Sequence, residues 1–105
     1  MSGSLQNLTD ENFEAEIAQG LTLVDFYADW CGPCRMLSPV LEEVAGQVND
    51  VKFAKVDIDG NQKTAGMMQV TSVPTVVLFK EGKEVDRIVG LRGGDEIKNF
   101  FSAHK

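Results

Sequence analysis

Apolar residues along this chain of 105 residues follow two different spacings, and their alternation predicts an α/β fold. Four stretches are predicted to be strands: Leu21 to Ala28, Val51 to Ile58, Thr75 to Lys80 and Glu84 to Val89. The first of them is almost continuously apolar, which is typical of a strand buried on both faces. A shorter strand is expected from Leu5 to Leu8.

Helical spacing appears between these strands. After the second cysteine, apolar residues recur every three or four positions, at Cys34, Leu37, Leu41, Val44, Ala45 and Val48. Thr9, followed by two acids, predicts a helix start. A short helix is expected from Asn61 to about Met67. A final amphipathic helix is expected after Gly93-Gly94, with its apolar face at Ile97, Phe100 and Phe101.

This order of elements predicts a mixed sheet, parallel in its first part and antiparallel in its last part, with helices on both faces. The last two strands join around Glu81-Gly82 as a hairpin. The order of strands within the sheet cannot be read from the pattern. Because no linker or repeat divides the chain, we expect one domain over residues 1–105, with residues 1–4 as a flexible native tail or the remnant of an expression tag.

Composition and charge exclude some classes of binding partner. The formal net charge is −6, and no cluster of Lys or Arg offsets it, which argues against nucleic acid or an acidic membrane surface as a partner. We see neither a signal-peptide pattern nor an apolar run of about 20 residues, so we expect a cytoplasmic protein without a membrane segment.

Both cysteines lie in the segment Trp30-Cys31-Gly32-Pro33-Cys34. Proline suits the first turn of a helix, so a helix is predicted to begin near Gly32. Cys31 then lies at the helix N-terminus, where free N–H groups and the helix dipole favour a reactive thiolate. Cys34 lies one turn further in, on the buried stripe, and is suited to resolving a mixed disulfide. Two residues three apart on a helix are close enough to form a disulfide.

Two other interpretations of the cysteine pair are weaker. As a structural cross-link it would close a loop of roughly four residues, worth only about 2 kcal/mol in the chain-entropy model. As a zinc site it supplies two of the four ligands that a closed site needs, and the only histidine is His104. Redox exchange is therefore favoured, and we expect no metal.

Three further residues are candidates for supporting this chemistry. Asp25 interrupts the apolar strand, so its pKa should be raised, and it is predicted to accept the proton of Cys34. The alternative is a carboxylate that caps a backbone group. Lys55, on the next strand, either tunes Asp25 or is a surface lysine with a buried stem. Trp30, beside the nucleophile, is predicted to wall a docking surface rather than to enter the core.

These features together resemble the thioredoxin family. The resemblance covers about Leu8 to Phe101. It is carried by Val24-Asp25-Phe26-Tyr27-Ala28, Trp30-Cys31-Gly32-Pro33-Cys34, Pro39, Lys55-Val56-Asp57, Val73-Pro74-Thr75, Phe79 with Gly82, and Val89-Gly90. It implies a thioredoxin fold, with a central mixed sheet, most often five-stranded, flanked by four helices. A lowered thiol pKa and a reducing couple are known properties of this family.

The resemblance also implies roles for individual residues. Cys31 corresponds to the nucleophile, Cys34 to the resolving cysteine and Asp25, with its neighbour Lys55, to the buried acid/base. Pro74 corresponds to the cis-proline that faces the disulfide, and the backbone of Val73 would pair with an extended substrate segment. The substrate groove would be bordered by Trp30, Gly32, Pro33 and Gly90, with Gly32 and Pro33 also tuning the redox couple.

The implied function is that of a monomeric protein-disulfide reductase and general dithiol electron donor without a bound cofactor. Thioredoxin reductase would supply the electrons. Substrates would include ribonucleotide reductase, methionine sulfoxide reductase and peroxiredoxins. The Gly-Pro pair argues against an oxidase or isomerase, where a histidine between the cysteines would stabilise the thiolate. A binding subunit that uses the groove without redox chemistry stays open.

The chain departs from the family pattern in two places. Met67-Met68 stands where an aromatic residue is common, and Gly66 weakens the short helix before it. Gly93-Gly94 replaces the usual polar cap of the last helix. We expect these departures to affect local stability and partner choice rather than the chemistry.

Overall fold

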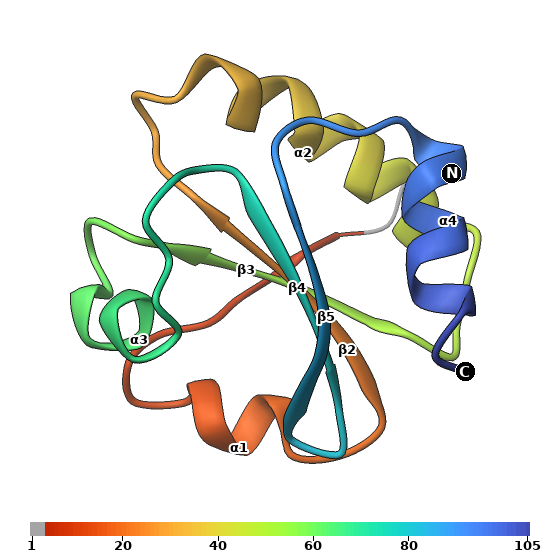
Figure 1. Cartoon of the computed structure of the whole chain (residues 1–105), viewed down its shortest axis with the longest axis horizontal. Helices are drawn as coiled ribbons and strands as arrows, with labels where there is room; N and C mark the ends of the chain where they lie inside the picture. Colours follow the sequence, from red (N-terminus) through yellow and green to blue (C-terminus); the bar gives the residue numbers. More distant parts are fainter. Residues whose placement is uncertain (1–3) are drawn as a thin grey trace.

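The computed structural model describes residues 4–105, so most of the expected N-terminal tail lies outside the described residues. A five-stranded sheet crosses the middle of the molecule, and helices lie on both of its sides (Figure 1). The elements are β1 (Gln6–Asn7), α1 (Phe13–Ile17), β2 (Leu21–Tyr27), α2 (Gly32–Ala45), β3 (Lys52–Asp57), α3 (Gln62–Met67), β4 (Thr75–Lys80), β5 (Lys83–Val89) and α4 (Gly94–Ser102).

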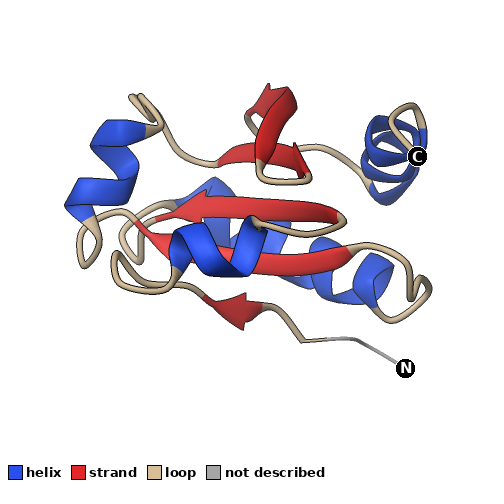
Figure 2. Ribbon diagram, turned by 90° about the horizontal axis from the view of Figure 1, so that it is seen from below, coloured by secondary structure: helices blue, strands red, loops and turns tan. Residues whose placement is uncertain are grey.

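The strand order is β1-β3-β2-β4-β5, which the sequence pattern did not provide. Strands β1, β3 and β2 are parallel, β4 runs antiparallel to β2, and β5 runs antiparallel to β4. Figure 2 shows the short β1 at the edge nearest the N-terminal end of the trace and the twisted hairpin at the other edge. The predicted division into a parallel and an antiparallel part is confirmed.

Two apolar cores lie on the two faces of this sheet. On one face, Leu23 of β2 packs with side chains of α2 and α4 such as Leu41 and Phe101. On the other face, Phe26 packs with Phe13 and Ile17 of α1. Alternate residues of β2 therefore enter both cores, which explains its nearly continuous apolar sequence.

The hairpin between β4 and β5 confirms the turn predicted at Glu81-Gly82. Both turn residues have positive φ, +52° at Glu81 and +85° at Gly82. Two consecutive residues in the left-handed region are characteristic of the tight turns that match the twist of a hairpin. Lys80 and Lys83 pair directly on either side of the turn.

The predicted helix start at Thr9 is four residues too early, because Thr9 begins a turn that leads into α1: its carbonyl accepts the Phe13 N–H at 2.9 Å and its hydroxyl accepts the Asn12 N–H at 3.3 Å. Helix α1 begins at Phe13, with Asn12 as its N-cap residue. The carboxylate of Asp10 points instead to the start of α3, where it accepts hydrogen bonds from the Thr64 backbone N–H at 2.8 Å and from the Thr64 hydroxyl at 2.6 Å. These bonds lower the pKa of Asp10 below its usual value. Asp10 therefore stabilises a helix far away in sequence.

Candidate functional site

The cysteine segment lies where β2 ends and α2 begins. Helix α2 starts at Gly32 with Pro33 in its first turn, as predicted. Cys31 is the N-cap residue, in an extended conformation, and the backbone N–H of Cys34 donates to its Sγ at 3.2 Å. The two cysteines are joined as a disulfide, with 5.3 Å between their Cα atoms. The helix terminus thus directs an N–H group at the sulfur of Cys31, which stabilises negative charge there.

Burial distinguishes the two cysteines less than the sequence suggested. Cys31 is 5% exposed and Cys34 is 3% exposed, so both cysteines are buried in the disulfide form. In this form each sulfur covers the other, and both pack in one small cluster with Ala28. The difference between them lies in their neighbours, because Cys31 faces the loop before β4 while Cys34 borders a cavity with Asp25.

The loop before β4 approaches Cys31 directly. The Sγ of Cys31 lies 3.7 Å from the carbonyl oxygen of Val73, and the Val73–Pro74 peptide bond is cis. The carbonyl of Pro74 accepts a hydrogen bond from the Gly90 N–H at 2.8 Å. Gly90 has φ +100°, a conformation that favours glycine. The structure therefore brings together Cys31, Val73, Pro74 and Gly90, which are far apart in sequence.

Asp25 is a buried carboxyl group near the cysteines. It is 2% exposed, and its Oδ1 has no hydrogen-bond partner among residues 4–105. Burial raises its pKa to about 7, while the charge of Lys55 acts in the opposite direction. A carboxyl that titrates near neutral pH can both accept and return a proton under physiological conditions. The alternative was that Asp25 caps a backbone group. Within residues 4–105, no backbone N–H donates to its Oδ1.

Lys55 and a cavity complete the surroundings of Asp25. Lys55 pairs with Asp25 in the register of β2 and β3, and its ammonium lies 5.6 Å from the centre of the Tyr27 ring. A cavity of about 210 Å³ is bordered by Asp25, Cys34 and Lys55, together with Tyr27, Ala28, Asp29, Arg35 and Ser38. Asp25 and Cys34 therefore border one cavity. Sequence reasoning missed Tyr27, Arg35 and Ser38.

Trp30 is 67% exposed, so it does not enter the core. Its indole Nε1–H donates to Oδ2 of Asp59 at 2.9 Å. Asp59 lies 29 residues further along the chain, and no local sequence pattern joins it to Trp30. Asp59 thus holds the tryptophan ring beside the cysteine segment. Gly32 and Pro33, between the cysteines, are exposed.

Within residues 4–105, no group of three or more His, Cys, Asp or Glu side chains is arranged to hold a metal ion. None of the helices in that part of the chain is long and apolar enough to cross a membrane.

An accessible loop, a two-cysteine helix start and a buried carboxyl with a pKa near neutral define a thiol–disulfide oxidoreductase. Comparison with known proteins agrees. The thioredoxin family profile matches residues 4–103, and the chain belongs to the thioredoxin family.

The similarity to individual relatives covers nearly the whole chain. It is 48% identical over 101 residues to a thioredoxin of Chlamydia trachomatis, covering 96% of this chain and 99% of that protein. It is 41% identical over 102 residues to a thioredoxin of Staphylococcus saprophyticus, covering 96% and 98%. The solved structure of a mutant thioredoxin from Halobacterium salinarum superposes with a TM-score of 0.84 at 39% identity, covering 96% and 90%. The chain is therefore a protein-disulfide oxidoreductase with a redox-active cysteine pair, which acts as a dithiol donor and reductase.

Proposed function

We propose that Cys31 attacks the disulfides of protein substrates and that Cys34 resolves the mixed disulfide, with Asp25 as the proton acceptor. The contact between Cys31 and the loop before β4 carries this proposal. A substrate segment that pairs with the Val73 backbone would lie against the sulfur 3.7 Å from its carbonyl. Strand addition of this kind binds substrates through their main chain and so tolerates many sequences.

The reaction has two exchange steps. In the first, the Cys31 thiolate attacks one sulfur of the substrate disulfide, the substrate S–S bond breaks, and one substrate thiolate leaves. In the second, the Cys34 thiol gives its proton to the Asp25 carboxylate, and the resulting thiolate attacks the sulfur of Cys31. The second substrate thiolate then leaves. The substrate gains two electrons, and the pair returns to the disulfide form.

The remaining residues have supporting roles in this proposal. Lys55 moderates the raised pKa of Asp25, so that its carboxylate is available near neutral pH. Trp30, Gly32, Pro33 and Gly90 border the substrate groove beside Val73 and Pro74. Gly32 and Pro33 also set the geometry between the two sulfurs.

Membership of the thioredoxin family supports a proposal for the partners and the location of this protein. We propose a single domain that works as a monomer in the cytoplasm and is re-reduced by a thioredoxin reductase. Ribonucleotide reductase, methionine sulfoxide reductases and peroxiredoxins are the proposed substrates, because their cycles leave disulfides that must be reduced. A structure titled for the thiol-resolving mechanism of a yeast mitochondrial peroxiredoxin is similar to this chain, with a TM-score of 0.89 at 32% identity.

Reduction of insulin disulfides tests the reductase function. With dithiothreitol as the electron donor, catalytic amounts of the wild-type protein should shorten the lag before the freed insulin chains precipitate. The double variant Cys31→Ser/Cys34→Ser is the control and should behave like buffer. A wild-type protein that gives no acceleration over this control would contradict the proposal.

A further inference from the structure

Besides Cys31, the side chain of Arg87 also contacts the segment between α3 and β4. Arg87 of β5 donates from a terminal guanidinium nitrogen to the carbonyl oxygen of Met68 at 2.9 Å. Met68 is the C-cap residue of α3, and the last carbonyls of a helix have no partner within the helix. Arg87 therefore binds the chain where α3 ends and the loop toward Pro74 begins.

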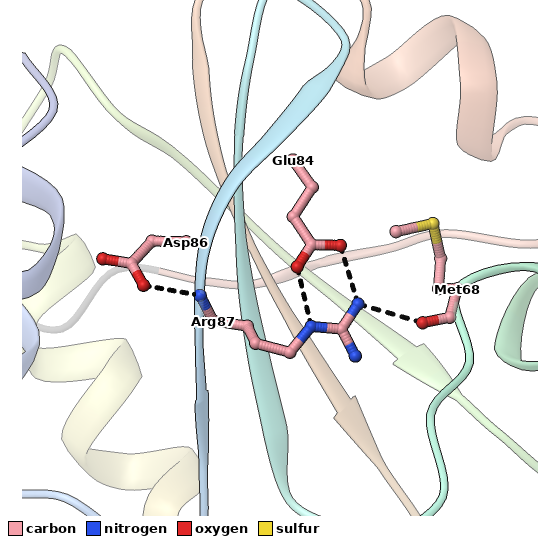
Figure 3. A network of polar contacts seen from close by, with 4 residues as sticks. All are labelled: Met68, Glu84, Asp86 and Arg87. Atoms are coloured by element: carbon pink, nitrogen blue, oxygen red, sulfur yellow. Dashed lines mark hydrogen bonds and ion pairs between the residues drawn. The ribbon is translucent and has the colours of Figure 1, made fainter.

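Glu84 holds this arginine in place. The carboxylate of Glu84 accepts hydrogen bonds from Nε and a terminal nitrogen of Arg87, both at 2.7 Å (Figure 3). A two-point contact of this kind fixes the plane of the guanidinium as well as its distance. Figure 3 shows the Met68 carbonyl on the side of the guanidinium away from the strand. It is bonded to the same terminal nitrogen of Arg87 that also donates to Glu84.

A β-bulge makes the pair possible. Residues three apart on a regular strand point to opposite faces of the sheet. Here Phe79 pairs with Glu84 while its neighbour Leu78 pairs with Asp86, so Val85 is an extra residue in β5. Because of this extra residue, the side chains of Glu84 and Arg87 lie on the same face of the sheet, and that of Asp86 points away from them (Figure 3).

Strand β5 and Gly90, the residue that follows it, thus contact the loop at both of the loop's ends. Arg87 binds the Met68 carbonyl where the loop begins, and the Gly90 N–H binds the Pro74 carbonyl, at 2.8 Å, where the loop ends. Between them, the hydroxyl of Thr75 donates to the Ser72 carbonyl at 2.6 Å. The segment that faces Cys31 is therefore held by an edge strand rather than by its own packing alone.

The first of these contacts fixes a particular peptide unit. The Met68 carbonyl belongs to the same peptide as the nitrogen of Gln69, whose φ is +56°. This conformation closes a Schellman motif at the end of α3, in which the Gln69 N–H donates to the Gly66 carbonyl at 3.1 Å and the Val70 N–H donates to the Ala65 carbonyl at 3.0 Å. By holding the Met68 carbonyl, Arg87 orients the peptide from which the loop turns toward Val73.

We propose that Arg87, fixed by Glu84 across the bulge, is a positioning residue that sets the loop Gln69–Pro74 for binding of protein substrates. The inference rests on the proposed pairing of substrate with the Val73 backbone. Arg87 acts through the loop and touches neither the cysteines nor the substrate. Its loss should weaken main-chain docking and leave the sulfur chemistry intact.

An Arg87→Met variant tests this separation. We expect its KM for insulin to rise about fivefold with little change in kcat, a size typical for the net loss of one ordinary hydrogen bond. Its reaction with a small aromatic disulfide, 5,5′-dithiobis(2-nitrobenzoate), which needs no main-chain docking, should stay at the wild-type rate. Glu84→Gln should raise the KM in the same direction by about twofold, and Arg87→Lys should lie between Arg87→Met and wild type.

Lys83→Met is the matched control, because it removes a cation from the exposed turn end of the same strand. Hydrogen exchange gives a second readout that does not depend on activity. The Val70 amide, which donates to the Ala65 carbonyl, should exchange about tenfold faster in Arg87→Met, while amides of β2 keep their wild-type rates.

Two results would overturn the inference. One is an unchanged KM for insulin in Arg87→Met, and the other is an equal loss of rate with both disulfides, which would indicate general destabilisation. A wild-type protein that fails to reduce insulin would instead contradict the proposed function, so the two failures are distinguishable.

Discussion

A Cys34→Ser variant is expected to accumulate on protein substrates as a stable mixed disulfide through Cys31, with turnover reduced roughly a thousandfold or more. The first exchange step uses only Cys31, whose sulfur accepts the Cys34 backbone N–H at 3.2 Å. That N–H remains in the serine variant. Without a second thiol, the mixed disulfide has no internal nucleophile to break it. Mass spectrometry of the trapped adduct after peptide digestion identifies the linked cysteine.

The reciprocal variant provides the control. Cys31→Ser should form no adduct and should lose turnover to the same extent, because Cys34 lies within the first turn of α2 and the sulfur at 3.7 Å from the Val73 carbonyl is that of Cys31. Trapping through Cys34 in this variant, at a rate comparable with trapping through Cys31, would contradict the assignment of roles.

Replacement of the buried carboxyl should stabilise the protein at neutral and alkaline pH. We expect Asp25→Asn to be more stable than wild type at pH 8 by roughly 2–4 kcal/mol. Ionised Asp25 is buried, and its Oδ1 finds no partner in the described chain, so its charge opposes folding. Urea denaturation of the oxidised proteins measures the difference.

The pH dependence of this effect has a definite sign. The pKa of Asp25 is about 7 in the folded protein against 3.8 for an ordinary aspartate. Between these values the folded state binds more protons than the unfolded state, so the free energy of unfolding falls as pH rises. The advantage of Asp25→Asn should therefore be absent below pH 3.8, grow through this window and level off above pH 7. An advantage independent of pH would show that burial of the ionised carboxylate is not its cause.

Two comparisons make this prediction specific. Lys55→Met removes the charge that opposes the shift, so the pKa of Asp25 should rise further, as seen by NMR titration of its carboxyl carbon. Lys52→Met, on the same strand but paired with Glu16, should leave that pKa unchanged. Asp25→Asn should also slow turnover about a hundredfold at pH 7, since it removes a general base.

Much of the fold was predictable because a few residues determine their local structure. The apolar run of β2 requires burial on both faces, Pro33 suits only the first turn of α2, and Glu81-Gly82 suits a tight hairpin turn. The cysteine pair and the buried Asp25 were likewise evident, because each conflicts with its local sequence unless it has a chemical role.

The remaining features depend on contacts between distant segments. The bond of Asp10 to Thr64, that of Trp30 to Asp59 and that of Arg87 to Met68 join parts of the chain that no local pattern connects. The bulge at Val85 changes which face Arg87 occupies, and regular alternation predicts the wrong one. The near-equal burial of the two cysteines also depends on the tertiary arrangement around them.

Equilibration of the Cys31/Cys34 pair with glutathione decides whether the protein is a reductant. The protein is incubated in buffers of graded ratios of reduced to oxidised glutathione, quenched with a thiol-reactive reagent and analysed by mass. A reductase of this kind should have a reduction potential at or below about −260 mV, so the disulfide form should persist until reduced glutathione is in very large excess. A reduction potential of about −120 mV would mark an oxidant and contradict the reductase function. The dithiol form would then dominate already at low ratios of reduced to oxidised glutathione.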